Sequence, residues 1–146
     1  MVRLSRPQRQ GEALRLLLDT HIWIWWFGSA DELSSREREA LGAAAELGGV
    51  ALSAISLWEV QMLHSLGRVQ LDRPFETWLI EATAPDVVQV LPLDVPVVMA
   101  LDQLPESFHG DPADRIIVAT ARAFDLPLMT RDRAIRRSRA VRLWAA

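Results

Sequence analysis

The stretch Leu14-Arg15-Leu16-Leu17-Leu18-Asp19-Thr20 decides the fold of this chain. Residues 14–18 form a short, nearly all-apolar run, which is typical of a β-strand covered by protein on both faces. Asp19 and Thr20 end this run and can cap a helix over residues 21–27, which Gly28 ends. Because a buried strand followed directly by a helix is the repeating unit of parallel sheets, we expect an α/β fold.

The same alternation of strands and helices continues along the chain. Further strands are expected at residues 50–53, 87–91, 126–130 and 140–144. Helices are expected to begin at the capping box of Ser34 and Glu37, at Ser56, behind Pro74, after Asp94 and at Ala113. We therefore predict a flexible extension over residues 1–13 and a single domain over residues 14–146. Its central parallel sheet should have about five strands flanked by helices.

Composition excludes several classes of protein. A chain of 146 residues, half of them hydrophobic, can bury one core and is too short for two ordinary domains. It has no cysteine, which excludes disulfides and thiolate chemistry, and no lysine, which excludes a P-loop or a Schiff base. No apolar stretch reaches the roughly 20 residues that span a bilayer, and the first residues do not form a signal peptide. We expect a cytoplasmic protein that does not enter membranes.

Four acidic residues stand at the edges of apolar runs. They are Asp19, Glu59, Asp114 and Asp132. The first and the last leave the carboxyl ends of two predicted strands, and the other two lie in the first turns of helices that start from the same edge of the sheet. We therefore expect the four carboxylates to converge in one cleft, where Mg²⁺ or Mn²⁺ would relieve their mutual repulsion.

Each acid also has a simpler interpretation, in which it is only a helix cap, a turn residue or a surface residue. Asp111, one helical turn before Asp114, is either a fifth metal ligand or the cap of the helix. The net charge of −3 does not exclude nucleic acid as a partner, because two bound divalent cations would bring the total to about +1 (−3 + 4).

Several polar residues accompany the acids. Thr20, Ser56 and Thr130 can hydrogen-bond the carboxylates or metal-bound water, although they can equally cap backbone groups. The three histidines do not form a zinc spacing, but His109 lies in the loop beside Asp111. We therefore expect supporting roles for Thr20, Ser56, Thr130 and His109.

Arginines cluster near the carboxyl end of the chain. Arg131, Arg133, Arg136 and Arg137 flank Asp132 and are predicted to contact RNA phosphates, unless they are the solvated face of a terminal helix. The apolar helix over residues 22–27 must cover nearly its whole surface, so Trp25 points to a dimer or a bound partner.

Four motifs of this chain, in this order, resemble those of PIN-domain proteins of the VapC toxin type. They are Leu17-Leu18-Asp19-Thr20-His21, Ser53-Ala54-Ile55-Ser56-Leu57-Trp58-Glu59, His109-Gly110-Asp111-Pro112-Ala113-Asp114 with the helix that follows, and Leu126-Pro127-Leu128-Met129-Thr130-Arg131-Asp132. The resemblance implies a Mg²⁺- or Mn²⁺-dependent endoribonuclease, the toxin of a type II toxin–antitoxin pair. It also implies a homodimer that a small cognate antitoxin inhibits.

By motif position, the resemblance makes Asp19, Glu59, Asp114 and Asp132 the catalytic, metal-binding acids, with Asp111 as a variant of the third motif. These carboxylates would hold cations that activate water for attack on a phosphodiester, leaving a 5′-phosphate and a 3′-hydroxyl. A phosphoryl-aspartate protein is disfavoured, because the families it would resemble use a lysine. The remaining alternative is a metal-free PIN-like module that binds RNA or protein, and measured Mn²⁺ binding would separate it from the nuclease.

Overall fold

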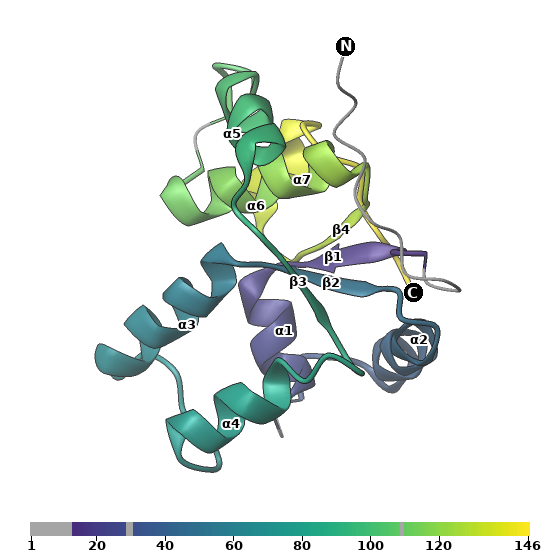
Figure 1. The fold of residues 1–146 in the computed structure, drawn as a ribbon, viewed down its shortest axis with the longest axis vertical. Helices are drawn as coiled ribbons and strands as arrows, with labels where there is room; N and C mark the ends of the chain where they lie inside the picture. Colours follow the sequence, from purple (N-terminus) through teal and green to yellow (C-terminus); the bar gives the residue numbers. More distant parts are fainter. Residues whose placement is uncertain (1–12, 29–30, 109) are drawn as a thin grey trace.

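The computed structural model describes residues 13–28, 31–108 and 110–146, and its core is a parallel sheet with helices on both faces (Figure 1). The strands are β1 (Leu16–Leu18), β2 (Val50–Ser53), β3 (Gln89–Leu91) and β4 (Leu128–Met129), in the spatial order β3-β2-β1-β4. The helices are α1 (Thr20–Trp26), α2 (Ser35–Glu46), α3 (Ile55–Ser65), α4 (Phe75–Ala82), α5 (Val95–Asp102), α6 (Pro112–Phe124) and α7 (Arg133–Ser138). The predicted α/β class is confirmed.

The central strand, β1, pairs in parallel with β2 on one side and β4 on the other. The strand predicted at residues 140–144 is reduced to one parallel bridge between Leu128 and Leu143. Two hydrogen bonds support the bridge, from Leu128 N to Arg142 O (2.8 Å) and from Trp144 N to Leu128 O (2.9 Å). Because β4 is only two residues long, it offers too short an edge for a full fifth strand.

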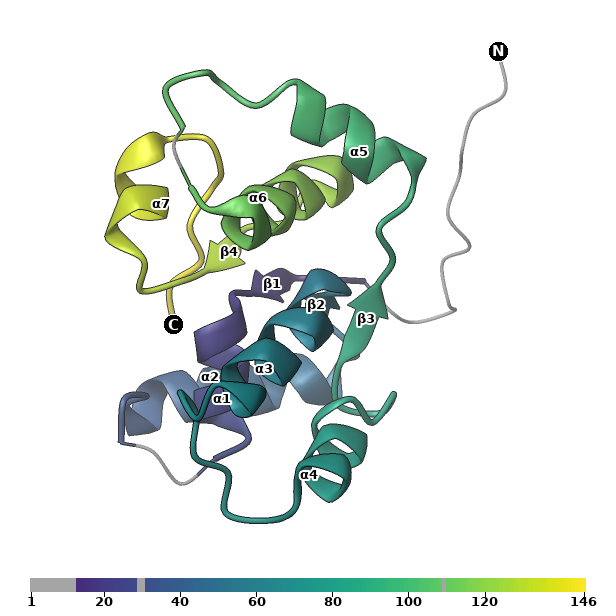
Figure 2. The same ribbon diagram turned by 90° about the vertical axis from the view of Figure 1, so that its left-hand side faces the viewer.

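The sheet separates two apolar cores. Leu16 and Leu18 face a core formed with α1, α2, α3 and α4, whereas Leu17 faces a core formed with α5, α6 and α7. Figure 2 shows these two groups of helices on opposite sides of the strands. Since all three leucines are fully buried, each contributes roughly 1.5–3 kcal/mol, which explains the continuous apolar run of β1.

Helix starts mostly follow the predictions. Ser34 and Glu37 form the expected capping box, in which Ser34 Oγ accepts from Glu37 N (3.1 Å) and Glu37 Oε1 accepts from Ser34 N (2.9 Å). The prediction that Ser56 caps a helix is wrong, because the N-cap of α3 is Ala54 and Ser56 is the second residue of the helix. Ser53 Oγ accepts from the Ile55 backbone N–H (3.2 Å), so the first turn does not need Ser56.

Some predictions fall outside the described residues, namely His109 and nearly all of the extension at residues 1–13. In the part of the chain that the structure describes, no helix is long and apolar enough to cross a membrane.

Candidate active site

Asp19 and Asp132 follow neighbouring parallel strands, so both lie at the carboxyl edge of the sheet. Thr130, which directly follows β4, joins them. Its hydroxyl donates to Asp19 Oδ2 (2.6 Å) and accepts from the Asp132 backbone N–H (2.9 Å). The predicted supporting role of Thr130 beside the acids thus has a definite geometry, since one hydroxyl contacts two of the acidic residues.

Asp19 is held on both carboxylate oxygens. Oδ1 accepts from the Thr20 backbone N–H (2.8 Å), which caps α1, and Oδ2 accepts from Thr130. The side chain is only 7% exposed, and burial raises its pKa, although these two hydrogen bonds offset part of the effect. The orientation of this carboxylate is therefore determined by the protein.

Glu59 lies in the first half of α3 and is only 8% exposed. Its Oε1 atom has no hydrogen-bond partner among the described residues. Burial is the main cause that raises the pKa of Glu59, while the Thr20 hydroxyl lowers it and the charge of Asp19 raises it. A buried carboxylate oxygen without a donor is costly unless a ligand supplies one, so this atom points to a missing partner.

Thr20 and Ser56 bring α1 and α3 together beside these acids. Their hydroxyl oxygens lie 2.8 Å apart in a hydrogen bond, and both residues are fully buried. Ser56 therefore acts in packing the two helices at the site, a contact between residues 36 positions apart that the local sequence pattern did not indicate.

Asp114 lies in the first turn of α6 and is partly buried. Its pKa is raised to about 7, first by burial and then by the negative charges of four other acids. Those acids are Asp111, Asp19, Asp132 and Glu59. The charges of the other three predicted site acids thus contribute to the raised pKa of Asp114.

Asp111 and Asp132 both cap helices. Asp111 Oδ1 accepts from Asp114 N (2.8 Å) at the start of α6, and Asp132 Oδ1 accepts from Ile135 N (2.9 Å) at the start of α7. The capping interpretation is thus correct for Asp111, whereas Asp132, for which a turn was the simpler expectation, is also a helix cap. Each cap uses only one oxygen of the carboxylate.

Two further residues lie near the acids but were not among the predicted site residues. A Cβ atom on Gly110 would lie 2.7 Å from the Phe108 ring and 3.0 Å from Asp114 Cβ, so only glycine fits beside Asp114 without displacement. A positive charge on His21 would lower the pKa of both Asp19 and Glu59, which places this exposed residue near the carboxylates. Its position two residues after Asp19 was the available signal.

Comparison with known proteins identifies the family. A family model for the PIN domain matches residues 16–140. The chain belongs to the PIN-domain family. It is 37% identical over 124 residues to Ribonuclease VapC22 of Mycobacterium tuberculosis, an alignment that covers 85% of this chain and 92% of the relative.

Solved structures share the PIN fold at lower identity. VapBC2 from Rickettsia felis, bound to a DNA fragment from its promoter, superposes with a TM-score of 0.69 at 15% identity, over 90% of this chain and 98% of that one. DNA-bound VapBC from Salmonella typhimurium gives a TM-score of 0.68 at 17% identity, with the same coverage. At these identities the likeness supports the fold alone.

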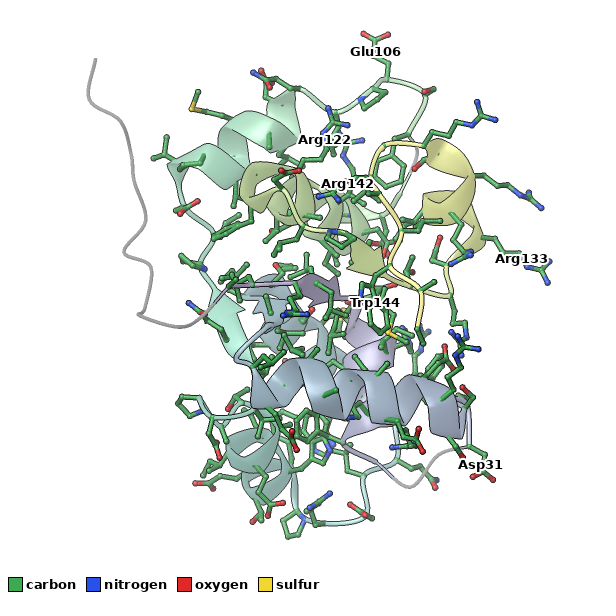
Figure 3. All side chains as sticks on the ribbon, turned by 90° about the vertical axis from the view of Figure 1, so that its right-hand side faces the viewer. Asp31, Glu106, Arg122, Arg133, Arg142 and Trp144 are labelled. Carbon is green, nitrogen blue, oxygen red and sulfur yellow. The ribbon has the colours of Figure 1, made fainter. Side chains whose placement is uncertain are left out.

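The arginines around the acids of this PIN domain fall into two groups. Arg131 donates to both oxygens of Glu37 (2.7 and 2.8 Å), and Arg136 donates to Thr130 O (3.1 Å). Arg133 and Arg137 are exposed and have no hydrogen bond or ion pair within the described residues, and Arg133 points away from α7 (Figure 3). Two of the four predicted phosphate contacts are therefore already engaged in intramolecular contacts.

The chemistry of these acids is compatible with a hard divalent cation. Their donors are all carboxylate oxygens, Glu59 has an unpaired buried oxygen, and Asp114 experiences uncompensated repulsion. Among the residues described, no three acidic or histidine side chains form a ready-made ligand set. Mg²⁺ usually keeps several waters and binds through one or two carboxylates together with substrate phosphates, so it does not require a complete protein ligand set.

Proposed function

We propose that this PIN-domain protein is a Mg²⁺- or Mn²⁺-dependent endoribonuclease and the toxin of a VapBC-type type II toxin–antitoxin pair. One observation carries the proposal: burial and the charges of neighbouring acids, among them Asp19, Glu59 and Asp132, raise the pKa of Asp114 in a chain that is 37% identical to Ribonuclease VapC22. Repulsion of this kind opposes folding, and such a site is retained where function requires it. RNA is the substrate class that follows from the relative.

Each acid has a proposed role. Asp19, Glu59, Asp114 and Asp132 would hold the cation, with Asp111 near enough to interact with Asp114. When bound, a divalent cation supplies an activated water for in-line attack and stabilises the leaving oxygen. Thr130 keeps Asp19 oriented, and the exposed arginines Arg133 and Arg137 position the RNA backbone.

The partners of the proposed toxin are a small cognate antitoxin and a second copy of the chain. Solved PIN-fold neighbours include VapBC assemblies. Exposed apolar side chains on this chain offer surface for such contacts, among them Trp58 (52%), Ile80 (65%) and Val95 (65%). Trp25 is half-buried against the core that contains α1, so it contributes less free surface than its sequence position suggests.

Metal titration tests the proposed activity directly. Purified protein should cleave single-stranded RNA with Mg²⁺ or Mn²⁺, lose cleavage with EDTA, and recover it when the cation is restored in excess. The products should carry 5′-phosphates, which labelling of the new ends would detect. Unchanged cleavage under chelation would exclude the metal mechanism.

The alternative function, a PIN-like module that only binds RNA or protein, makes a different prediction. Such a module would bind RNA without cleaving it and would show no Mn²⁺ affinity by electron paramagnetic resonance. The unpaired buried oxygen of Glu59 favours the nuclease, because a binding module has no evident use for it.

A further inference from the structure

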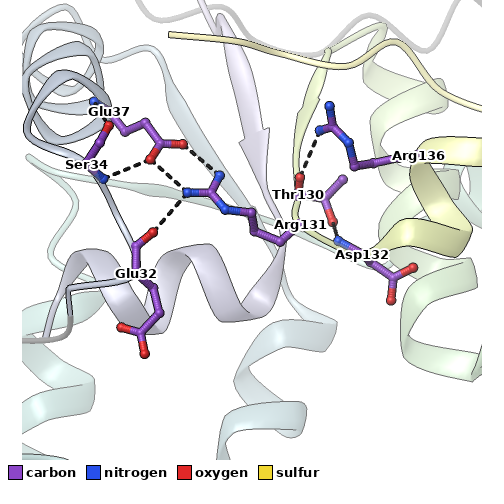
Figure 4. Close-up of polar contacts among 7 residues, drawn as sticks. All are labelled: Glu32, Ser34, Glu37, Thr130, Arg131, Asp132 and Arg136. Carbon is purple, nitrogen blue, oxygen red and sulfur yellow. Dashed lines mark hydrogen bonds and ion pairs between the residues drawn. The ribbon is translucent and has the colours of Figure 1, made fainter.

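Arg131 was predicted to contact RNA, but its side chain is hydrogen-bonded within the protein. Its guanidinium donates three hydrogen bonds, to Glu37 Oε2 (2.7 Å), Glu37 Oε1 (2.8 Å) and Glu32 O (2.9 Å). Figure 4 shows this contact spanning from the loop after β4 to the beginning of α2. A phosphate could bind these donors only if the bidentate contact between Arg131 and the Glu37 carboxylate were broken. Such bidentate contacts are among the stronger polar contacts in proteins.

Glu37 is itself held in place, so it is a suitable anchor. Its carboxylate also accepts from the Ser34 backbone N–H (2.9 Å), as the third helical residue of the capping box. The hydrogen bonds from Arg131 lower the pKa of Glu37 to about 2, and those from Ser34 act in the same direction. A carboxylate in the first turn of a helix is further favoured by the helix dipole.

The segment that Arg131 belongs to needs such an anchor. Residues 130–132 belong to neither a helix nor a strand, yet they include Thr130, which contacts Asp19, and Asp132. On one side the segment is fixed by Arg136, which donates to Thr130 O (3.1 Å). On the other side it is fixed by the Arg131–Glu37 ion pair, between residues 94 positions apart.

We propose that Arg131 is a positioning residue, which acts through Glu37 to hold Asp132 in place relative to Asp19 for cation binding. The proposal rests on the function proposed above. It also separates Arg131 from Arg133 and Arg137, whose side chains are free to meet the RNA backbone. A contact that orients a metal-binding residue typically changes metal affinity when it is removed.

The test compares Arg131→Gln, Glu37→Gln and the double variant. Glutamine at position 37 can still complete the capping box, so Glu37→Gln removes the ion pair while keeping the cap. Both single variants should lower Mn²⁺ affinity by about 10-fold, and the double variant should lose no more than either one. Electron paramagnetic resonance of free Mn²⁺ measures this affinity without RNA.

The direction of the change in Mn²⁺ affinity shows whether Arg131 acts by positioning Asp132 or only through its charge. If only charge mattered, removing the cationic Arg131 would raise Mn²⁺ affinity, while removing Glu37 would lower it. A rise or no change in Arg131→Gln would overturn the proposal. So would an additive double variant, or a fall in RNA affinity and salt dependence with EDTA present, since a phosphate contact predicts that fall.

A second readout does not depend on the metal. The Asp132 amide, which donates to Thr130 Oγ1, should exchange its hydrogen faster in both glutamine variants than in the wild type. Ser34→Ala is the matched control, since it removes the other half of the capping box and should leave exchange at Asp132 unchanged. Unaltered exchange in Arg131→Gln contradicts the proposal.

The two readouts also distinguish failure of the proposed function. If the wild type binds no Mn²⁺, the metal-dependent function fails, and exchange at Asp132 then decides whether Arg131 positions the segment. If the wild type binds Mn²⁺ and the variants bind it equally well, only the role of Arg131 fails.

Discussion

The carboxylate at the end of β1 and the carboxylate at the beginning of α6 have opposite surroundings. At the end of β1, Asp19 is almost fully buried and both of its oxygens accept hydrogen bonds. At the beginning of α6, the carboxylate of Asp114 accepts no hydrogen bond from the described residues, and neighbouring acids help to raise its pKa to about 7. Hydrogen-bond donors therefore orient the carboxylate of Asp19, whereas the carboxylate of Asp114 is repelled by the neighbouring acids.

This difference suggests a division of tasks within one site. Donors that hold Asp19 keep its geometry constant whether or not a cation is present. Asp114 gains most from a cation, because a nearby positive charge would replace the repulsion with attraction. The predictions below test that division, beginning with the largest expected effect.

Asp19→Asn should reduce RNA cleavage at least about 10³-fold, because it removes a charged metal ligand whose contribution is on the order of 4 kcal/mol in the transition state. The side-chain shape is kept, so circular dichroism and the melting temperature should remain close to those of the wild type. Cleavage assays with excess Mn²⁺ measure the effect. Wild-type activity in this variant would remove Asp19 from the mechanism.

Asp114→Asn should change stability rather than geometry. Because the pKa of Asp114 is raised from 3.8 to about 7 in the folded state, the folded protein binds this proton more tightly than the unfolded chain. The stability from this group is complete below about pH 4 and is lost as the pH rises through 7. Without metal, Asp114→Asn should therefore stabilise the protein at pH 8, by about 1–2 kcal/mol after allowance for solvent screening.

Urea unfolding at pH 5 and pH 8 in EDTA would measure this change. Asp111→Asn is a useful control, because asparagine also caps helices. This change removes only the neighbouring charge that raises the pKa of Asp114 most. It should give a smaller gain at pH 8. If Asp114→Asn is no more stable than the wild type at pH 8, the repulsion assigned to the beginning of α6 is wrong.

The same contrast applies to the arginines and gives the smallest expected effect. Arg131 and Arg136 are engaged within the protein, whereas Arg133 and Arg137 make no hydrogen bond or ion pair with the part of the chain that the structure describes. Replacing Arg133 and Arg137 with alanine should weaken binding of every RNA by roughly tenfold. The log–log salt slope should fall by about 0.7 for each RNA phosphate that an arginine no longer neutralises.

Fluorescence anisotropy at several salt concentrations would measure both quantities, with EDTA present to prevent cleavage. Arg68→Ala is the control, since this exposed arginine follows the carboxyl end of α3, whereas Glu59 lies in the first half of that helix. Equal effects of the control and the double variant would show that general charge, and not a defined surface on α7, binds RNA.

The sequence predicted those parts of the fold that depend on local patterns. The apolar run of β1, the capping box of α2 and the helix expected from Ala113, which is α6, were all predicted, because each is specified by residues close in sequence. The start of α3 was misplaced by two residues, since a side-chain cap was expected at Ser56, whereas the N-cap is Ala54 and Ser53 Oγ accepts from the Ile55 backbone N–H. The fifth strand was overestimated, because the short length of β4 limits its pairing.

For the site, the sequence placed the candidate acids at one edge of the sheet but did not indicate the contacts that hold them. Their convergence follows from parallel strands ending at one edge. The Thr130 contact with Asp19 and the Arg131 contact with Glu37 join residues 111 and 94 positions apart, and no local pattern indicates such partners. The crowding around Gly110 is likewise visible only in three dimensions.

The position of β4 beside β1 has a consequence for synthesis on the ribosome. Leu17 N donates to Pro127 O (2.9 Å) and Asp19 N donates to Met129 O (3.0 Å). One edge of β1 therefore stays unpaired until residues more than a hundred positions later have been synthesised. A nascent chain can pair β1 with β2 and β2 with β3 while this edge of β1 is still open, and open strand edges promote aggregation. Until residue 132 has been added, the growing polypeptide lacks Asp132, one of the four proposed site acids, and its open strand edge favours association with neighbouring chains.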